Sequence, residues 1–279
     1  MELRLPRGSL DLSVPLVMGV LNVTPDSFSD GGHHADVESA LRRAASMVAE
    51  GARIIDVGGE STRPGAEAVP EQLELDRVIP VIERLNRNFG VVISIDTMKP
   101  AVMRAACQAG AQIINDVNAL RAPGAVEAAS QTGAAVCLMH MQGGPRTMQQ
   151  SPQYAEVAEE VCQFFADRIL ACQRGGIDLS SLLLDPGIGF GKTLDHNLRL
   201  LSQLPRLAAL GRPLLVGVSR KSMFQHLLGR EVSERLPASL GAASVAAWLG
   251  AAIVRAHDVR ATADALAVVQ AIRQAGGGK

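Results

Sequence analysis

Eight short apolar runs, each ending at a polar residue or a glycine, recur along the chain with a longer segment between each pair. The runs end at Asn22, Gly59, Asp96, Asp116, His140, Asp185, Ser219 and His257. Each run is apolar almost throughout instead of alternating with polar residues, which is typical of parallel strands covered on both faces. The runs therefore predict eight parallel strands whose connections cross over on the outside of the sheet.

The segments between the runs have the apolar periodicity of amphipathic helices. One helix is expected to begin at Asp36, whose side chain can cap it. The others are expected at 70–85, 100–109, 124–131, 154–174, 194–204, 237–248 and 261–274. Strict alternation of strand and helix over 279 residues predicts an α/β fold, a (β/α)8 TIM barrel in a single domain. An open doubly wound sheet is the alternative, which would use fewer strands and leave its edges exposed.

The two ends of the chain differ from this pattern. Residues 1–14 alternate in polarity around Gly8 and Ser9, which predicts a short N-terminal β-hairpin that plugs the N-terminal mouth of the barrel. Residues 15–275 are expected to form the barrel itself. Residues 276–279 are glycine-rich and are expected to be a frayed tail.

Charge and composition exclude several classes of function. The 27 Lys and Arg residues and 28 Asp and Glu residues give a net charge of −1, so binding to nucleic acid or to a membrane is not expected. The most apolar stretch, 236–254, is interrupted by Ser239 and Ser244 and is expected to be a buried helix and strand. The four cysteines form no C-x-x-C pair, which favours free thiols in the cytoplasm.

Active sites of such barrels form at the carboxyl ends of the strands, where the polar run-ending residues are expected to meet. A single residue of this kind is usually only a turn former. Asp96, Asn115 and Asp185 are suited to the N–H groups of a buried flat heterocycle. Five side chains that are cationic or can become so are suited to bind an anionic group: Arg63, Arg220, Lys221, Arg255 and His257. The alternative for Arg255 is an ion pair with Asp258 at the rim.

A P-loop and a zinc site are both excluded by the sequence. The stretch DPGIGFGKT has Pro186 where the first glycine of a P-loop belongs, so its glycines are expected to let a loop pass close over a flat ligand. Lys192 is then expected to face solvent at a helix start. His140 is interpreted as a loop residue, because His33, His34, His140 and His226 lack the spacing of zinc ligands.

Seven motifs in order resemble those of the dihydropteroate synthase family, and the resemblance covers essentially the whole chain. They are GVLNVTPDSFSDGG, DVGGESTRPGA, SIDTMKPAV, IINDV, LDPGIGFGKT, GVSRKS and RAHDV. The resemblance implies a transferase that forms a C–N bond. It condenses 7,8-dihydropterin-6-ylmethyl diphosphate with para-aminobenzoate to 7,8-dihydropteroate and diphosphate, with Mg²⁺, in folate biosynthesis.

The resemblance also implies roles for individual residues. The pterin pocket would comprise Asp96, Asn115, Asp185 and Lys221, with walls from Met139, Phe190 and Gly217. The diphosphate site would comprise Asn22, Thr62, Arg63, Arg255 and His257, and Asn22 would also ligate Mg²⁺. Para-aminobenzoate would lie near Thr62, Pro64, Phe190, Ser219 and Lys221, with Phe28 closing over it. The catalytic residues would be Asp96, Lys221, Arg255, His257 and Arg63.

The chemistry favours a dissociative, SN1-like substitution. Negative charge grows on the leaving diphosphate, where cations would stabilise it. Positive charge develops on the pterin, where the carboxylate of Asp96 would stabilise it. Three alternatives stay open: a Schiff-base role for Lys221, a methyltransferase-like enzyme that binds methyltetrahydrofolate, and a non-catalytic pterin-binding paralogue. The methyltransferase reading would not explain Arg63, Arg255 and His257.

The resemblance further implies a homodimer and a sulfonamide target. The Ala- and Gly-rich segment 239–248 is a candidate for the dimer surface. The loop 26–32 is expected to be a lid over the site, with Gly31 and Gly32 as its hinge.

Overall fold

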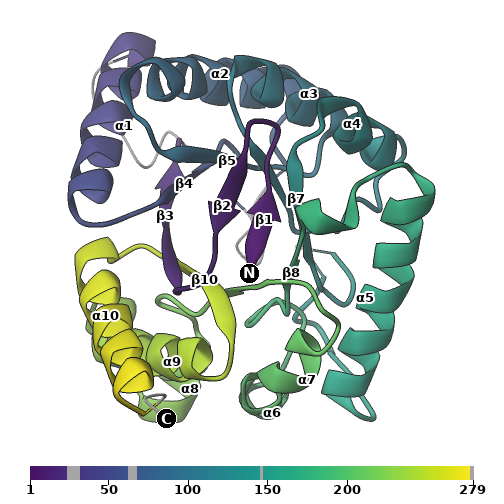
Figure 1. Ribbon diagram of the computed structural model, residues 1–279, viewed down its shortest axis with the longest axis vertical. Helices are drawn as coiled ribbons and strands as arrows, with labels where there is room; N and C mark the ends of the chain where they lie inside the picture. Colours follow the sequence, from purple (N-terminus) through teal and green to yellow (C-terminus); the bar gives the residue numbers. More distant parts are fainter. Residues whose placement is uncertain (24–31, 62–67, 145–146, 277–279) are drawn as a thin grey trace.

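Eight parallel strands form a central ring that is surrounded by helices in the computed structural model (Figure 1). The structure describes residues 1–23, 32–61, 68–144 and 147–276. The barrel strands are β3 (Leu16–Asn22), β4 (Ile54–Gly58), β5 (Val92–Asp96), β6 (Ile113–Asp116), β7 (Ala135–Met139), β8 (Leu182–Asp185), β9 (Leu214–Gly217) and β10 (Ala251–Ala256).

The ring is closed, since β10 pairs in parallel with both β3 and β9. Going round the barrel, the strands follow the order β10-β3-β4-β5-β6-β7-β8-β9, so sequence neighbours are spatial neighbours throughout. The predicted TIM barrel is therefore confirmed, and the open-sheet alternative is wrong. Because all eight strands are parallel, their carboxyl ends lie at one mouth.

The helices follow the predicted alternation, with three differences. They are α1 (Gly32–Ala49), α2 (Glu71–Asn88), α3 (Pro100–Ala109), α4 (Ala125–Thr132), α5 (Val157–Arg174), α6 (Leu194–Ser202), α7 (Leu204–Ala208), α8 (Met223–Leu228), α9 (Leu236–Trp248) and α10 (Val259–Gly276). Helix α1 begins at Gly32 and not at Asp36. The predicted helix 194–204 is two helices, because Pro205, the second residue of α7, has no backbone N–H with which to continue the hydrogen bonds of α6. The short helix α8 was not predicted.

The N-terminal hairpin closes the opposite mouth, as predicted. Strands β1 (Glu2–Arg4) and β2 (Ser9–Asp11) pair antiparallel, and Figure 1 shows them across the centre of the ring. Their apolar face packs on the inward-facing residues at the bottom of the barrel. This cluster includes Leu3, Leu5, Leu10, Leu12, Met18, Ile54, Ile113, Cys137, Leu183, Leu215 and Ile253. The hairpin leaves the carboxyl-terminal mouth uncovered.

The larger part of the core lies between the outer faces of the strands and the helices. All four cysteines are free thiols, and Cys137 and Cys172 are buried. Within the described ranges, no helix is both long enough and apolar enough to cross a bilayer.

Candidate active site

Cross-strand pairing brings the predicted strand-end residues to one level. Asn22 pairs with Gly58, Gly58 pairs with Asp96, and Asp96 pairs with Asn115. On the other side of the barrel, Arg255 pairs with Gly217. Residues that are up to 233 positions apart in the chain (255 − 22) therefore form a continuous rim at the open mouth.

Arg255 lies between two buried carboxylates. Its Nε donates to Asp56 Oδ2 at 2.7 Å, and its terminal Nη2 donates to Asp96 Oδ2 at 2.9 Å. The Arg255 side chain is 22% exposed, whereas those of Asp56 and Asp96 are 0% and 6% exposed. Burial opposes the charge on Arg255, but the two carboxylates outweigh it and raise the pKa of the guanidinium. Arg255 is therefore a permanent cation whose remaining N–H groups can meet an anion.

Asp96 has an unusual electrostatic environment. Burial raises its pKa to about 7, against the opposing effect of Arg255 and with the help of the negative charge on Asp56. Its Oδ1 is buried and has no hydrogen-bond partner among the described residues, and the same is true of Asp56 Oδ1. Unsatisfied buried carboxylate oxygens are costly in a protein fold. Buried carboxylate oxygens without a partner are typical of ligand-binding sites.

Asp56 was not singled out by the sequence analysis. It accepts hydrogen bonds from Arg255 Nε and, at 3.0 Å, from Asn115 Nδ2. It therefore orients one predicted pterin-binding residue and one predicted diphosphate-binding residue together. The available signal was a carboxylate in the middle of the apolar run RIIDVGG, where a buried charge requires a partner.

Lys221 and Asp185 lie on the other side of the mouth, with the Phe190 ring. The Lys221 Nζ is 4.2 Å from the centroid of that ring, which is a cation–π contact. Burial lowers the pKa of Lys221 to about 8, although Asp185 favours the charged form. Burial raises the pKa of Asp185, while the backbone N–H of Gly187, which donates to its Oδ1 at 2.7 Å, acts in the opposite direction.

The remaining described candidates occupy the same mouth. Met139 belongs to a small apolar cluster that Phe190 packs against. His257 Nδ1 is 3.0 Å from Ser219 Oγ, and the His257 backbone N–H also donates to that hydroxyl. The structure thus brings eleven predicted site residues to this mouth: Asn22, Asp96, Asn115, Met139, Asp185, Phe190, Gly217, Ser219, Lys221, Arg255 and His257. Phe28, Thr62, Arg63 and Pro64 lie outside the described residues, as does most of the predicted lid.

One alternative and one expectation are wrong. Asp258 does not pair with Arg255, because Arg220 binds it through Nε at 2.9 Å and Nη2 at 2.6 Å. Lys192 does not face solvent, since it is 3% exposed and its ammonium lies 3.0 Å from His140 Nδ1. His140 is a loop residue as predicted, since it directly follows the end of β7, but it is buried, at 6% exposed.

The mouth offers oxygen ligands that are suited to Mg²⁺. A Cβ placed on Gly58 would lie 3.7 Å from Asn22 Oδ1 and 3.9 Å from Asp96 Oδ2, so both oxygens flank this glycine. Within the described ranges, no cluster of three or more His, Cys, Asp or Glu side chains has metal-site geometry. Magnesium is usually bound through one or two protein oxygens together with water and substrate phosphates. A sparse amide and carboxylate set of this kind fits it.

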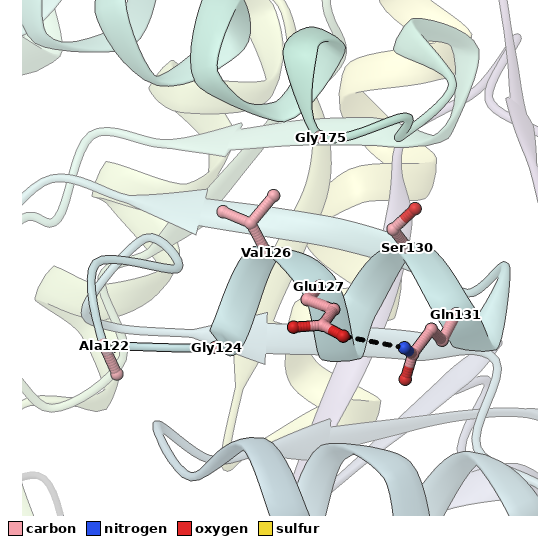
Figure 2. A pocket seen from close by; sticks show the side chains of 7 residues that line it. All are labelled: Ala122, Gly124, Val126, Glu127, Ser130, Gln131 and Gly175. Carbon is pink, nitrogen blue, oxygen red and sulfur yellow. Dashed lines mark hydrogen bonds between the residues drawn. The ribbon is translucent and has the colours of Figure 1, made fainter.

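A hollow on the outer surface is distinct from the mouth. It lies along α4 beside Gly175, and Figure 2 shows Glu127 hydrogen-bonded to Gln131 at its edge. Its other lining residues are Ala122, Gly124, Val126 and Ser130. None of them is a strand-end residue of the barrel, so this hollow is no part of the candidate active site.

Comparison with known proteins gives consistent matches. Residues 18–257 match the family model described as pterin binding enzyme. The curated dihydropteroate synthase of Escherichia coli (strain K12) is 55% identical over 263 residues, covering 94% of this chain and 93% of that protein. The Yersinia pestis dihydropteroate synthase, solved with a sulfonamide drug complex, is 51% identical with a TM-score of 0.94 and covers 98% of this chain and 100% of its own. The Xanthomonas albilineans dihydropteroate synthase, solved with 7,8-dihydropteroate, is 47% identical with a TM-score of 0.88 and covers 98% of this chain and 99% of its own.

Proposed function

The chain belongs to the pterin-binding enzyme family, within its dihydropteroate synthases, and from that premise we propose how its residues carry out the reaction. The substrates are 7,8-dihydropterin-6-ylmethyl diphosphate and para-aminobenzoate, and the products are 7,8-dihydropteroate and diphosphate. The observation that carries the proposal is the Asp56–Arg255–Asp96 cluster. It places a permanent cation beside a buried carboxylate, at a mouth suited to a substrate with both a charged leaving group and a heterocycle.

The bond between the pterin methylene carbon and the diphosphate oxygen breaks first. Its electron pair leaves with the diphosphate, whose charge is stabilised by Arg255 and His257, and by Thr62 and Arg63 outside the described residues. Preorganised cations in a largely buried site act strongly on such charge. Asn22, with water and the phosphate oxygens, would hold Mg²⁺, which when bound would act as a Lewis acid on the leaving group.

The departing diphosphate leaves positive charge on the methylene carbon and the pterin ring. Ionised Asp96 stabilises that charge, while Asn115, Asp185 and Lys221 orient the ring between Met139, Phe190 and Gly217. The lone pair on the para-aminobenzoate nitrogen then forms the C–N bond, and a nitrogen proton passes to water. Ser219, Pro64 and Phe28 complete the site for this second substrate. Since the amine is already neutral near pH 7, no strong general base is required.

The experiment is a turnover assay with purified protein, both substrates and Mg²⁺. We expect dihydropteroate and diphosphate to form in equal amounts. Pterin binding without turnover would support the non-catalytic paralogue instead, and borohydride trapping of substrate on Lys221 would support the Schiff-base alternative. Isotope effects that indicate tight bimolecular attack would contradict the dissociative pathway.

Replacing Asp56 with asparagine should change both the rate and its dependence on pH. In the wild type, kcat/KM should rise with pH through about 7 as Asp96 ionises. The negative charge on Asp56 raises the pKa of Asp96, so Asp56→Asn should move this acid limb to lower pH. Weakening one charge-assisted hydrogen bond to Arg255 should lower the plateau about tenfold. An unshifted acid limb in a pH–rate profile would show that another group controls it.

We also propose a homodimer that forms through α9 and α10. The side chains of Val245, Trp248, Val268 and Ile272 are apolar and more than half exposed, and the two helices pack side by side (Figure 1). Sedimentation should show a dimer that Val268→Glu converts to monomer. The matched change Leu170→Glu, at an exposed leucine on α5, should leave the dimer intact. A monomeric wild type would refute the proposal.

A cytoplasmic location is proposed as well. The four free thiols support it, because reducing compartments keep cysteines unpaired.

A further inference from the structure

Lys192 places a buried ammonium group among neutral acceptors. Its Nζ lies 3.0 Å from His140 Nδ1, 3.0 Å from the Gly187 carbonyl oxygen and 3.0 Å from that of Phe190. The carbonyl oxygen of His140 lies at 3.3 Å. An ammonium has three hydrogens and accepts nothing, so this side chain is fully used in holding backbone and ring acceptors together.

These acceptors come from two loops that cross at contact distance. The loop after β8 supplies Gly187 and Phe190, and the loop after β7 begins at His140. A Cβ added to Gly187 would lie 2.0 Å from the His140 carbonyl oxygen, and one added to Gly191 would lie 2.7 Å from that of Gln142. The crossing therefore turns several carbonyl oxygens toward the same point. The Lys192 ammonium donates to the carbonyl groups of Gly187, Phe190 and His140, and the Gly187 carbonyl also accepts from the Phe190 backbone N–H.

The lowered pKa of the His140 ring agrees with this geometry. Burial, followed by the charge on Lys192, lowers the pKa of His140 to about 2, so the ring is neutral. Its Nδ1 can then accept from Lys192 only if the ring proton is on Nε2. Burial lowers the pKa of Lys192 to about 7, while Asp185 acts to keep it charged.

The loop after β8 also forms one side of the mouth. The Phe190 carbonyl binds Lys192, and the Phe190 ring lies under the Lys221 ammonium. A Cβ added to Gly189 would lie 3.0 Å from Lys221 Cδ, so the backbone there also sets where Lys221 runs. The Gly187 N–H binds Asp185. Three groups assigned to the pterin pocket thus depend on one short segment.

We propose that Lys192 is a positioning residue for pterin binding, which acts by tying the loops after β7 and β8 together through the carbonyl groups of Gly187 and Phe190. This inference rests on the proposed function and adds to it a residue that would not touch the substrate. Without the ammonium, the loop retains its other side-chain donors, since Gln149 binds the Gly189 carbonyl and Tyr154 binds the Gly191 carbonyl. Removal of the Lys192 side chain removes the contacts to Gly187 and Phe190, and should therefore displace the loop. The contacts that remain should keep the barrel folded.

The test uses Lys192→Ala and Lys192→Met with a stable pterin carboxylate as the probe in calorimetry. Both variants should bind the probe at least tenfold more weakly than the wild type. Millimolar ammonium or methylammonium should restore much of the affinity in Lys192→Ala, because a small N–H donor can enter the space of the lost side chain. It should restore none in Lys192→Met, whose longer side chain fills that space. Tetramethylammonium, which has no N–H group, should restore none in either variant.

A neighbouring variant separates positioning from general stability. Thr193→Ala removes the side chain that caps α6 and accepts from the His196 backbone N–H, which should lower the thermal midpoint of the protein. It leaves the Lys192 contacts in place, so pterin affinity should stay within about twofold of wild type. Unchanged affinity in Lys192→Ala, or equal rescue by tetramethylammonium, would overturn the inference.

A measurement on the wild-type protein provides an independent check. The ¹⁵N chemical shifts of His140 should show a neutral ring protonated on Nε2 down to pH 5. A His140 that titrates near its ordinary pKa would mean that the Lys192 contact is absent in solution, whether or not the variants fold. Failure of the proposed function itself is distinguishable, because the wild type would then show no turnover, whereas failure of this inference leaves wild-type turnover and pterin binding intact.

Discussion

Arg255→Met should lower kcat/KM by about a thousandfold, which corresponds to about 4 kcal/mol of lost transition-state stabilisation. Methionine keeps the length of the aliphatic stem but removes every N–H donor. The leaving diphosphate then loses a preorganised cation. Asp96 also loses the charge that holds its pKa down, so it is more protonated at pH 7 and stabilises the pterin cation less. Steady-state kinetics with each substrate varied in turn would measure the loss.

Two further variants give this prediction its specificity. Arg255→Lys should recover little of the activity, because one ammonium lacks the planar fork that reaches Asp56 and Asp96 together. Arg84→Met removes an exposed arginine that pairs with Glu38 on the outer helices, and it should leave kcat/KM within about twofold. Surface pairs of that kind contribute on the order of 0–1 kcal/mol. Retention of more than a tenth of the activity in Arg255→Met would contradict the assigned role.

Asp96→Asn should lower kcat by a factor of about 10²–10³, with a much smaller change in the KM for the pterin substrate. Asparagine preserves the shape of the side chain and an acceptor oxygen, so the ground-state complex is largely kept. The charge that stabilises the developing pterin cation is lost. The acid limb of the pH–rate profile near 7 should disappear with it.

The thermal stability of Asp96→Asn should not fall together with its activity. The folded-state pKa of Asp96, about 7, is above its unfolded value of about 3.9. Its contribution to stability is therefore fully present below about pH 3.9 and is lost as the pH rises through about 7. At pH 8 the thermal midpoint of Asp96→Asn should equal or exceed that of the wild type. Loss of both activity and folding would point to a structural role instead.

Asp116→Asn is the matched control, since Asp116 is also buried and holds a turn through the backbone N–H groups of Asn118 and Leu120. That turn includes Ala119 and Leu120 at positive φ, a conformation that costs about 1–2 kcal/mol per residue. The control variant should therefore lose thermal stability and keep kcat within about threefold.

Much of the mouth was predictable because a closed parallel barrel needs no long-range information to align its strand ends. Once each apolar run is a strand, Asn22, Asp96 and Asp185 must share one rim. The N-terminal hairpin was equally accessible, since alternation about Gly8 and Ser9 predicts a turn. Helix α8 was missed because its six residues are too few to establish a period.

The surroundings of Lys192 and Asp56 could not be predicted from the sequence. A lysine just before a helix usually faces solvent, and only the crossing of two loops turns Lys192 inward. Asp56 faces the barrel mouth from inside an apolar run, and its partners lie 59 and 199 positions away. The pairing of Arg220, and not Arg255, with Asp258 likewise depends on side-chain direction. Each of these contacts is set by tertiary geometry that local patterns do not contain.

The hairpin plug has a consequence for how the chain assembles. Its leucines are synthesised before all eight barrel strands, yet Leu3 is buried in the same cluster as Ile253 on the last strand. Complete burial of the hairpin must therefore wait until β10 has paired with β3, so a segment made before every barrel strand is among the last to be protected. Late closure of this kind is intrinsically slow, because contacts distant in sequence must form before it is stabilised. During synthesis, the short leucine-rich segment is exposed apolar surface that a chaperone can hold.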